Sequence, residues 1–266
     1  MKRIQLFEFE DFSWFPKVLR TGMTHLIVVF HKMTGTPAVL AELIRKVREE
    51  RDFRRIVDIG SGSGGAMPLV LEAFNAEGGE PLEILLTDLH PNPAFVRQVN
   101  TTDPPNLRYH EAPVDATRLG DAPAGLKTMV NSFHHMPPEK ARAILLAAHT
   151  QKQPFLIYEM GQNNIPTLLW WLLLPLSLSI ILLMTWVMTP FVRPLTWQQL
   201  LFTYLIPIIP ICYTWDGQAS LVRMYTFKDL ELLLQGLESS DYTWSMGAAK
   251  KANGKSEGYY LLGMPA

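Results

Sequence analysis

Cysteine is nearly absent from the 266-residue sequence, which contains only Cys212. A chain with a single cysteine cannot form an internal disulfide, which fits a reducing compartment. An excess of charge is also lacking, because 24 basic and 25 acidic residues give a net charge of −1. No strong positive field is therefore present to hold a nucleic-acid backbone, and we expect no nucleic-acid partner. The opening segment MKRIQLFEFEDFSW lacks the continuous apolar core of a secretory signal.

Charged residues are missing from two long stretches in the second half of the chain. No Asp, Glu, Lys, Arg or His occurs in the 32 residues from Gly161 to Val192, or in the 22 residues from Pro194 to Trp215. A bilayer-spanning helix needs about 20 apolar residues, so the first stretch is ample and the second is marginal. Large aromatic residues lie toward the ends of both stretches, as interfacial aromatics often do. We predict an apolar helical hairpin over residues 161–216.

Two interpretations of this hairpin compete. It could be buried as a helix pair inside the protein or in a dimer interface, or it could associate with a membrane. Membrane association is favoured, because a domain of this size rarely buries two uncharged runs of such length. The sequence leaves open whether the hairpin spans the bilayer or dips into one leaflet. In either case the chain enters and leaves on the same side.

Around the hairpin, short apolar runs alternate with helical patterns. Strands are expected at 54–60, 82–88, 107–116, 126–133 and 154–160, followed by a pair at 242–251 and 258–265. Helices are expected at 37–51, 66–74, 137–150 and 225–237. This alternation predicts an α/β fold with a Rossmann-like, doubly wound, mostly parallel seven-stranded sheet. The expected parts are a helical N-terminal cap at 1–53, a ligand-binding domain at 54–160 and 217–266, and the hairpin insertion at 161–216.

A glycine-rich turn follows the first expected strand, in the segment VDIGSGSGG at residues 57–65. Glycine permits a positive φ and lets a ligand approach the backbone closely. The turn matches the dinucleotide pattern G-x-G-x-x-G from Gly60 to Gly65, and equally the pattern D-x-G-x-G-x-G from Asp58 to Gly64. In a dinucleotide site an acid about 20 residues further on binds the ribose hydroxyls, and Asp88 is placed for that role.

The positions of three acids separate these two interpretations. The carboxylate of Asp58, directly before the turn, would crowd a pyrophosphate but suits a cationic group such as an ammonium or a sulfonium. Asp88 follows the second expected strand and Asp115 the third. Parallel sheets of this kind bind ligands at the carboxyl ends of their strands. Three carboxylates at successive strand ends therefore favour S-adenosylmethionine (SAM) over a dinucleotide.

The same motifs resemble those of class I SAM-dependent methyltransferases. VDIGSGSGG is similar to the family's first motif, TDLHPN to the motif whose acid binds the ribose, and PVDATRL to the motif beside the adenine. NSFHHMPPEKARAIL resembles the fourth-strand segment near the methionine end of the cofactor, and the likeness covers roughly residues 50 to 160 and 220 to 266. The resemblance implies an enzyme that uses SAM and no metal. The cofactor-binding residues that we expect are Asp58, Gly60, Ser61, Gly62, Gly64, Asp88, Leu89, Asp115, Ala116 and Asn131.

Candidate catalytic residues follow the fourth and fifth expected strands. Methyl transfer is an in-line displacement, and holding the acceptor against the methyl group supplies much of the rate. A base is needed only where the acceptor is protonated. His134 and His135 are candidates for this base or for orienting the acceptor, and Glu159 is a third candidate. Alternatively, the histidines pack against the cofactor and a helix, and Glu159 caps the insertion.

Five further residues are candidates for contact with the substrate. Asp11, Trp14 and Arg20 lie in the expected cap, where the alternative is a solvated amphipathic helix. Asp216 and Arg223 follow the second uncharged stretch. Their charges could hold a polar head group at the membrane surface, or they could mark the point at which the chain leaves the membrane.

Together these features predict SAM-dependent methyl transfer to a hydrophobic or lipid-like acceptor at a membrane, with the catalytic domain facing the cytoplasm, where SAM is found. One alternative is a soluble methyltransferase for a small hydrophobic molecule, with the hairpin as a dimer interface. The others are a catalytically silent membrane scaffold and an NAD-linked oxidoreductase. The sequence identifies neither the acceptor nor the methylated atom (O, N or C), and it gives no oligomeric state.

Overall fold

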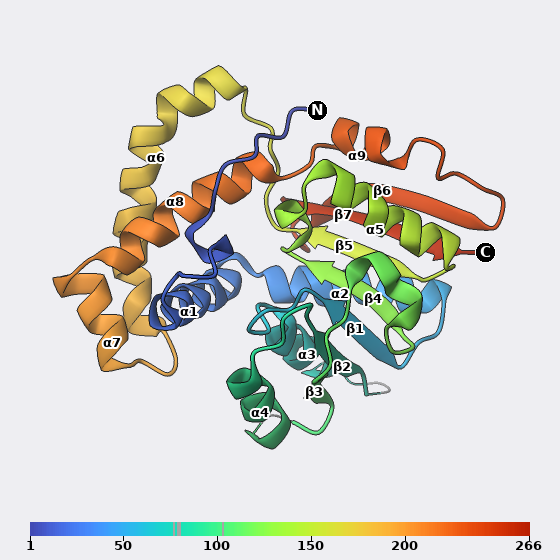
Figure 1. Cartoon of the computed structure of the whole chain (residues 1–266), viewed down its shortest axis with the longest axis horizontal. Coiled ribbons are helices and arrows are strands. Elements are labelled where there is room, and N and C mark those ends of the chain that lie inside the picture. The colour runs from blue at the N-terminus through green and yellow to red at the C-terminus, as the bar shows by residue number, and fades with distance from the viewer. Residues whose placement is uncertain (77, 79–80, 103) are drawn as a thin grey trace. The chain divides into compact units, whose positions relative to one another are not determined.

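The computed structural model describes residues 1–266 except 77, 79–80 and 103 (Figure 1). The described chain forms two compact units. Unit 1 contains Met1, Gly35–Gly161 and Phe227–Ala266, and unit 2 contains Lys2–Thr34 and Gln162–Thr226. These boundaries differ from the expected parts, because the expected cap at 1–53 is divided between the two units. Unit 2 also extends past the expected insertion at 161–216.

A seven-stranded sheet with the spatial order β3-β2-β1-β4-β5-β7-β6 forms the centre of unit 1. Its strands are β1 (Arg55–Ile59), β2 (Glu83–Thr87), β3 (Leu107–Tyr109), β4 (Leu126–Val130), β5 (Phe155–Glu159), β6 (Tyr242–Lys250) and β7 (Ser256–Pro265). Strands β1 to β5 pair in parallel, whereas β7 runs antiparallel to both β5 and β6. The predicted Rossmann-like, mostly parallel seven-stranded sheet is confirmed.

Two strands are shorter than the sequence predicts. β3 ends at Tyr109 rather than continuing to residue 116. Pro113 lies in the segment that follows, and proline cannot donate a hydrogen bond to a strand ladder. β4 ends at Val130, where Asn131 adopts a positive φ of 51° and turns the chain toward the short 3-10 helix η3 (Phe133–His135). The side chains that follow both strands are therefore on loops.

The described helices of unit 1 are α2 (Thr36–Glu50), α3 (Met67–Ala76), α4 (Pro93–Thr102), α5 (Pro138–Thr150) and α9 (Phe227–Leu234). Pro37 lies in the first turn of α2, a position that proline favours. Helix α4 was not predicted from the sequence, because the residues before it have turn character. The side chain of Asn92 accepts a hydrogen bond from Ala94 N at 3.1 Å, which caps this helix.

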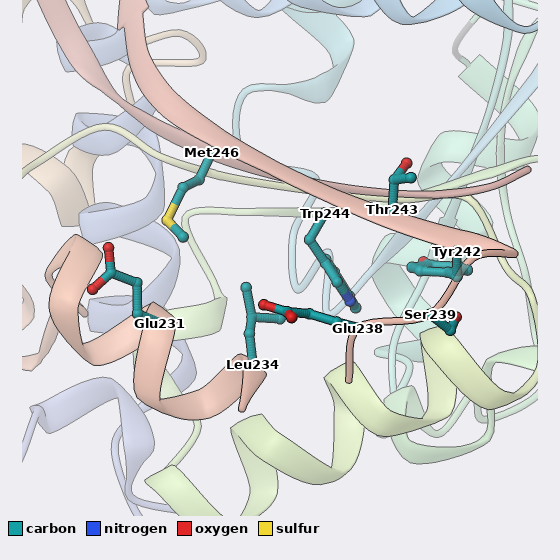
Figure 2. Close-up of a pocket in the computed structure, with 8 residues that line it drawn as sticks. All are labelled: Glu231, Leu234, Glu238, Ser239, Tyr242, Thr243, Trp244 and Met246. Carbon is teal, nitrogen blue, oxygen red and sulfur yellow. The ribbon is translucent and has the colours of Figure 1, made fainter. Parts of the chain in front are cut away.

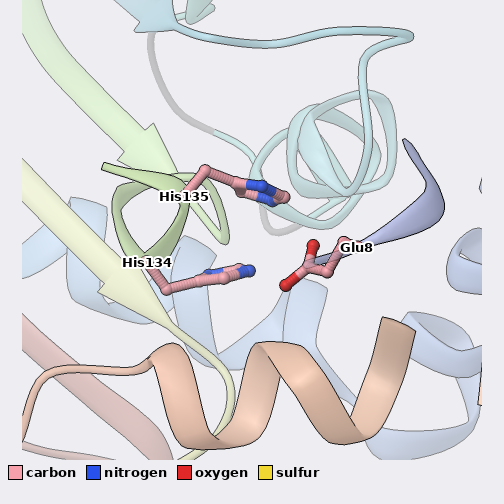
Figure 3. Close-up of side chains that lie close together, drawn as sticks. All are labelled: Glu8, His134 and His135. Atoms are coloured by element: carbon pink, nitrogen blue, oxygen red, sulfur yellow. The ribbon is translucent and has the colours of Figure 1, made fainter. Parts of the chain in front are cut away.

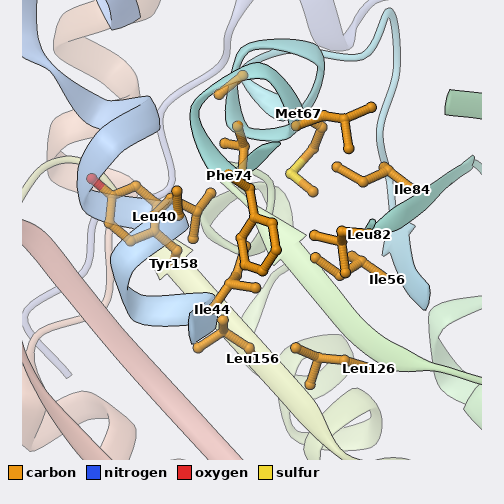
Figure 4. Packing of buried hydrophobic residues seen from close by; sticks show 14 of the residues in the cluster. Leu40, Ile44, Ile56, Met67, Phe74, Leu82, Ile84, Leu126, Leu156 and Tyr158 are labelled. Atoms are coloured by element: carbon orange, nitrogen blue, oxygen red, sulfur yellow. The ribbon is translucent and has the colours of Figure 1, made fainter. Parts of the chain in front are cut away.

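The main hydrophobic core of unit 1 lies between one face of the sheet and helices α2, α3 and α4 (Figure 4). Leu40 and Ile44 of α2 and Phe74 of α3 are buried against Ile56 and Leu156 of the sheet. Complete burial of such side chains stabilises a fold by about 1.5–3 kcal/mol each. Helices α5 and α9 cover the opposite face and contact each other (Figure 1). The carboxyl edge of the parallel strands stays available for loops that carry function.

Unit 2 is helical. It contains α1 (Lys17–Thr34), α6 (Thr167–Met188), α7 (Trp197–Leu200) and α8 (Ile208–Arg223), with the short turns η1 (Phe9–Asp11), η4 (Thr189–Phe191) and the π-helical η5 (Leu201–Leu205). Its core includes Met23 and Leu26 of α1, Met188 of α6 and Ile209 of α8. Trp170 Nε1 donates to Gln218 Oε1 at 3.0 Å, which joins the start of α6 to the C-terminal part of α8.

The second arm of the expected hairpin is not one continuous helix. The segments Trp197–Leu205 and Ile208–Arg223 are bent by 79° relative to each other, and Pro207 lies at the break. Within the described residues, Thr167–Phe191 is the single unbroken helix that is long and apolar enough to cross a membrane. Its mean hydropathy is 2.2, and 11% of its most apolar window is buried. Up to three crossings result if each bent pair of helices counts as one span.

Candidate functional site

The glycine turn joins β1 to α3 at the carboxyl edge of the parallel strands. Gly60 and Gly62 have φ values of 72° and 51°, a region that strongly favours glycine. Ser61 N donates to Thr87 O at 2.9 Å, which fixes the turn against β2. A Cβ atom at Gly62 would meet no atom within 4 Å. One side of this backbone is therefore open to a ligand.

Asp58 lies buried in β1 next to the turn. Its Oδ1 accepts a hydrogen bond from Thr128 Oγ1 at 2.7 Å, and its Oδ2 accepts one from Ser61 Oγ at 2.6 Å. Burial raises the pKa of Asp58 to about 7, although the two hydroxyl donors oppose this change. The negative charge of Asp88 raises this pKa further. A cation bound beside Asp58 would favour the ionised carboxylate.

Asp88, directly after β2, faces the glycine turn. Its Oδ2 accepts a hydrogen bond from Gly62 N at 3.0 Å, and its Oδ1 accepts one from His90 N at 2.8 Å. The carbonyl oxygen of Gly62 accepts from Tyr109 Oη at 2.9 Å. Gly62 is thus held from β2 and from β3. Each carboxylate oxygen has two lone pairs, so Asp88 keeps the capacity to bind a pair of ligand hydroxyls.

A hollow of about 310 Å³ lies beside Leu89 and Asp115, and Ala116 follows Asp115 in the chain. Thr117 N and Thr117 Oγ1 both donate to Asp115 Oδ1 at 2.8 Å. These hydrogen bonds hold the pKa of Asp115 below its usual range, so the carboxylate is charged at neutral pH. An exposed leucine side chain beside a hydrogen-bond acceptor suits a flat heteroaromatic ring that carries an amino group. The other lining residues are His110, Ala112, Pro113, Val114, Arg118 and Asp121.

Asn131 follows β4 and connects it to β5. Its backbone N donates to Tyr158 O at 2.8 Å, and its Oδ1 accepts from Met160 N at 2.7 Å. The Nδ2 atom is buried, and no acceptor for it occurs among the described residues. A buried donor without a partner costs about 1–3 kcal/mol, and a ligand oxygen at this edge would remove that cost.

Glu159, the last residue of β5, holds His134 at two points. Its Oε1 accepts from the backbone N of His134 at 2.9 Å, and its Oε2 lies 2.8 Å from His134 Nδ1. In the tautomer that carries its proton on Nδ1, the ring donates to Glu159, and the buried Nε2 carries the lone pair. The rings of His134 and His135 lie 4.3 Å apart (Figure 3). This geometry gives His134 a fixed orientation with Nε2 as its basic atom.

Three of the five substrate candidates connect the N-terminal segment of unit 2 to α8. Arg223, which is 1% exposed, forms ion pairs with Glu8 at 2.9 Å and with Asp11 at 2.6 Å. The two carboxylate oxygens of Asp216 accept from the backbone N atoms of residues 9 and 10 at 2.8 and 3.2 Å. The structure thus brings Asp11 and Arg223 together and gives Asp216 a capping role.

The other two substrate candidates also contact the N-terminal segment. The guanidinium of Arg20 donates to Glu10 O at 3.2 Å and to Phe12 O at 2.8 Å. The ring of Trp14 stacks on Phe12 with centroids 5.2 Å apart and is 66% exposed. Asp11, Arg20, Asp216 and Arg223 therefore all contribute to the internal structure of unit 2, whereas Trp14 is largely exposed.

A second hollow, of about 370 Å³, lies between α9 and β6 (Figure 2). In the sheet register, Trp244 of this hollow pairs with Gly263, which pairs with Phe155 at the start of β5. The hollow is therefore at the end of the strands opposite the glycine turn and is separate from the candidate site. Its lining consists of Glu231, Leu234, Glu238, Ser239, Tyr242, Thr243, Trp244 and Met246.

Three residues that shape the candidate site were missed by the sequence analysis. Tyr109 and Thr128 reach the glycine turn and Asp58 from neighbouring strands, and the register that brings them there has no local signal in the sequence. Thr117 could have been found, because a donor two residues after an aspartate forms a recognisable local turn. The expected residues at the ends of β1 to β5 do lie along one edge of the sheet.

No family model and no curated protein matches this sequence. Solved structures do match. The plantazolicin methyltransferase BpumL in complex with SAH is 10% identical with a TM-score of 0.53, and the match covers 93% of this chain and 88% of that one. The chain has the fold of class I SAM-dependent methyltransferases. BpumL with a monoazolic desmethylPZN analog and SAH gives a TM-score of 0.51 at the same identity and coverage.

An O-methyltransferase family protein from Burkholderia thailandensis is a further match, with 13% identity and a TM-score of 0.48. The match covers 91% of this chain and 57% of that protein. At such identities the likeness establishes the fold. The activity has to be argued from the site.

Proposed function

We propose that this chain is a SAM-dependent methyltransferase that acts on a hydrophobic acceptor at a membrane surface. The observation that carries the proposal is the arrangement of three carboxylates, those of Asp58, Asp88 and Asp115, along the strand edge that holds the glycine turn. A pyrophosphate would be repelled by this arrangement, whereas a sulfonium or ammonium group would be attracted. The methyltransferase fold and the SAH complexes of BpumL support the same ligand.

The residues present fit SAM in each of its parts. Asp88 would bind the ribose hydroxyls, and the hollow beside Leu89 and Asp115 would take the adenine, whose amino group donates to a carboxylate. The open backbone at Gly62 would lie against the methionine part. The buried amide of Asn131 would donate to the carboxylate of that part. This assignment uses the one buried donor of the site that lacks an acceptor among the described residues.

When bound, SAM supplies an activated methyl group on a sulfonium. The chain orients the acceptor and removes its proton. We assign the second task to His134, because Glu159 fixes its ring and leaves the lone pair on Nε2. General bases of this type contribute about 10²–10⁴-fold to a rate. The adjacent ring of His135 restricts the space around this base.

The membrane part of the proposal is supported by unit 2. The segment Thr167–Phe191 has the length and hydropathy of a membrane helix, and most of its residues are exposed. Exposed apolar surface of this extent marks contact with a membrane or a partner protein. The acceptor class that we propose is accordingly a lipid-like or other hydrophobic molecule, and unit 1 would face the cytoplasm, where SAM is available.

The test is calorimetric titration of the detergent-purified protein with S-adenosylhomocysteine. We expect micromolar binding by the parent protein and its loss in Asp88→Ala. Asp241→Ala is the matched control, because Asp241 is an exposed acid beside the start of β6. Micromolar binding would justify screening membrane lipid extracts with a labelled methyl donor.

Three outcomes would contradict the proposal or its membrane part. Absence of binding by the parent protein, together with binding of NADH, would replace the methyltransferase assignment with that of an oxidoreductase. Unchanged binding by Asp88→Ala would show that the cofactor site lies elsewhere. Solubility without detergent, with a dimer in solution, would favour the soluble methyltransferase.

A further inference from the structure

Helix α6 is apolar on its outer face as well as on its packed face. Its buried stripe contains Trp170, Leu174, Thr185 and Met188. The outer face is uncharged and strongly exposed, with Leu168 at 83% and Leu172 at 75%. A helix at the surface of a water-soluble protein presents polar residues to the solvent. The outer face of α6 is therefore suited to hydrocarbon rather than to water.

The exposed apolar surface continues beyond the end of α6. Phe191, Trp197 and Leu205 are all more than half exposed, at 65%, 67% and 76%. With 22 residues, α6 is about 33 Å long, so its outer face alone is as long as a bilayer core is thick. By length α6 could stand across a bilayer or lie along one, and the helices packed against it decide between these orientations.

Helix α1 packs along the C-terminal half of α6. Leu19, Met23 and Leu26 of α1 share one apolar cluster with Met188 and with the neighbouring residues Ile181, Met184 and Val192. The exposed side of α1 is mixed, since Lys17, Thr21 and Lys32 are exposed on it together with Val18 and Met33. If α6 crossed the bilayer, α1 would be drawn into the hydrocarbon beside it. Lys17 and Lys32 lie at the two ends of α1, but Arg20, Thr24 and His25 lie between them and would enter the hydrocarbon, where an arginine costs up to about 2.5–3.5 kcal/mol.

Helix α8 is also unsuited to crossing. Its C-terminal half carries Asp216 and Arg223, which bind the polar N-terminal segment through the contacts described above. Its N-terminal end meets Leu205 and Pro207 at the 79° bend. A straight second crossing would need about 20 apolar residues in one path through the bilayer, and the 79° bend between residues 205 and 208 interrupts that path.

We infer that unit 2 is a monotopic anchor in which α6 lies along a single leaflet. The outer face of α6, with residues 189–206, enters the hydrocarbon boundary, while α1 and the C-terminal half of α8 remain on the aqueous side. The occupant of this surface is the lipid of one leaflet. Anchors of this kind sink about 5–10 Å into the boundary between head groups and acyl chains. This inference rests on the membrane part of the proposed function and selects one of its two orientations.

The single cysteine makes the orientation measurable. In a Cys212→Ala background, we would introduce Ser179→Cys on the outer face of α6, Arg193→Cys after α6, and Lys32→Cys on the aqueous side of α1. All three positions are exposed. Inverted membrane vesicles from the expression host would be treated with a membrane-impermeant maleimide, before and after the vesicles are opened by freeze–thaw, and then in detergent. Cys212→Val is a second background if the alanine variant does not fold, and SAH binding verifies the fold.

We expect Lys32→Cys to be labelled in sealed vesicles and Ser179→Cys to be labelled only in detergent. Arg193→Cys should behave the same way in sealed and in opened vesicles. Labelling of Arg193→Cys that appears only after opening would show that α6 crosses the bilayer and would overturn the inference. If the Ser179→Cys variant is labelled as fast as the Lys32→Cys variant, the outer face of α6 does not contact lipid. Absence of the protein from the vesicles would also contradict lipid contact. Intact SAH binding in those cases would leave the cofactor assignment standing, so the two failures are distinguishable.

Discussion

The hydroxyl group of Tyr109 donates a hydrogen bond to the carbonyl oxygen of Gly62 at 2.9 Å. Asp88 accepts from the N–H group of the same glycine at 3.0 Å. The backbone of the glycine turn is thereby held on both sides of one residue by two neighbouring strands. A turn that is fixed before the ligand arrives loses less conformational freedom on binding, and this raises the affinity.

Tyr109→Phe should weaken binding of S-adenosylhomocysteine by several-fold. The substitution removes one hydrogen bond, whose net value is about 0.5–1.5 kcal/mol, and it keeps the ring that packs edge-on against Phe95. Calorimetric titration measures the change. Tyr242→Phe is the matched control, because it removes a similar hydrogen bond to Gln153 O near the start of β5. Equal losses of affinity in the two variants would contradict a specific role for Tyr109.

Asp58 should make the stability of unit 1 depend on pH. Burial raises its pKa from the ordinary 3.8 to about 7, so the folded protein binds this proton more tightly than the unfolded chain does. This tighter proton binding contributes to the free energy of unfolding. The contribution is fully present below about pH 4 and is lost as the pH rises toward 7. Asp58→Asn is neutral throughout and should lack this decline. Thermal unfolding at several pH values should show that the melting temperature of the variant increases relative to that of the parent protein as the pH rises.

The same substitution should also weaken the binding of SAM, because a neutral amide attracts a cationic ligand less than a carboxylate does. Stability and affinity would then change in opposite directions at pH 8. A difference in melting temperature between Asp58→Asn and the parent that is the same at pH 4.5 and pH 8 would show that burial does not perturb this carboxyl group. Glu50→Gln, at an exposed acid at the end of α2, controls for the general effect of lost charge.

Glu159→Gln should slow methyl transfer with little effect on cofactor binding. An amide still accepts from one His134 donor, but it neither fixes the protonated Nδ1 tautomer nor stabilises the imidazolium that forms. We expect a loss of about 10²-fold or more, in line with the value of a positioned base. The measurement is transfer of labelled methyl groups to membrane extracts, with SAH titration in parallel. An unchanged rate would mean that the acceptor needs no base.

Arg223→Met should destabilise unit 2 strongly. The substitution removes the ion pair between Arg223 and the fully buried carboxylate of Glu8, and breaking a buried ion pair costs about 3–5 kcal/mol. Limited proteolysis in detergent should then release the N-terminal segment earlier than in the parent. The double variant Arg223→Met with Glu8→Gln should recover part of the loss, because it removes the uncompensated charge. Equal protease resistance of parent and single variant would contradict this role.

The sequence predicted the sheet well, because each buried parallel strand is a short apolar run with turn residues at its end. The runs at β1, β2 and β5 differ by at most one residue from the expected ranges at each end. The end of β3 was overestimated, since the apolar pattern continues into a segment where Pro113 prevents pairing. Helix α4 was missed because its capping Asn92 also fits a turn.

The candidate site was predictable in composition but not in its hydrogen bonds. Asp58, Asp88 and Asp115 have recognisable positions at strand ends, whereas the partners Thr128 and Tyr109 depend on strand register. The contact between His134 and Glu159 likewise requires β4 and β5 to be neighbours. The roles of Asp216 and Arg223 inside unit 2 had no local signal, because their partners lie more than 200 residues away in the chain.

Strand β7 lies between β5 and β6, although it follows both in the chain. On the ribosome, β5 is therefore made long before its neighbour in the sheet, and all of residues 162–226 emerges in the interval. During that interval β5 presents an unpaired edge, a hazard for aggregation. The apolar helix α6 becomes available to a membrane while the sheet is still incomplete. Under the proposed membrane association, delivery of the nascent chain to a lipid surface would then precede the folding of the unit that carries the glycine turn.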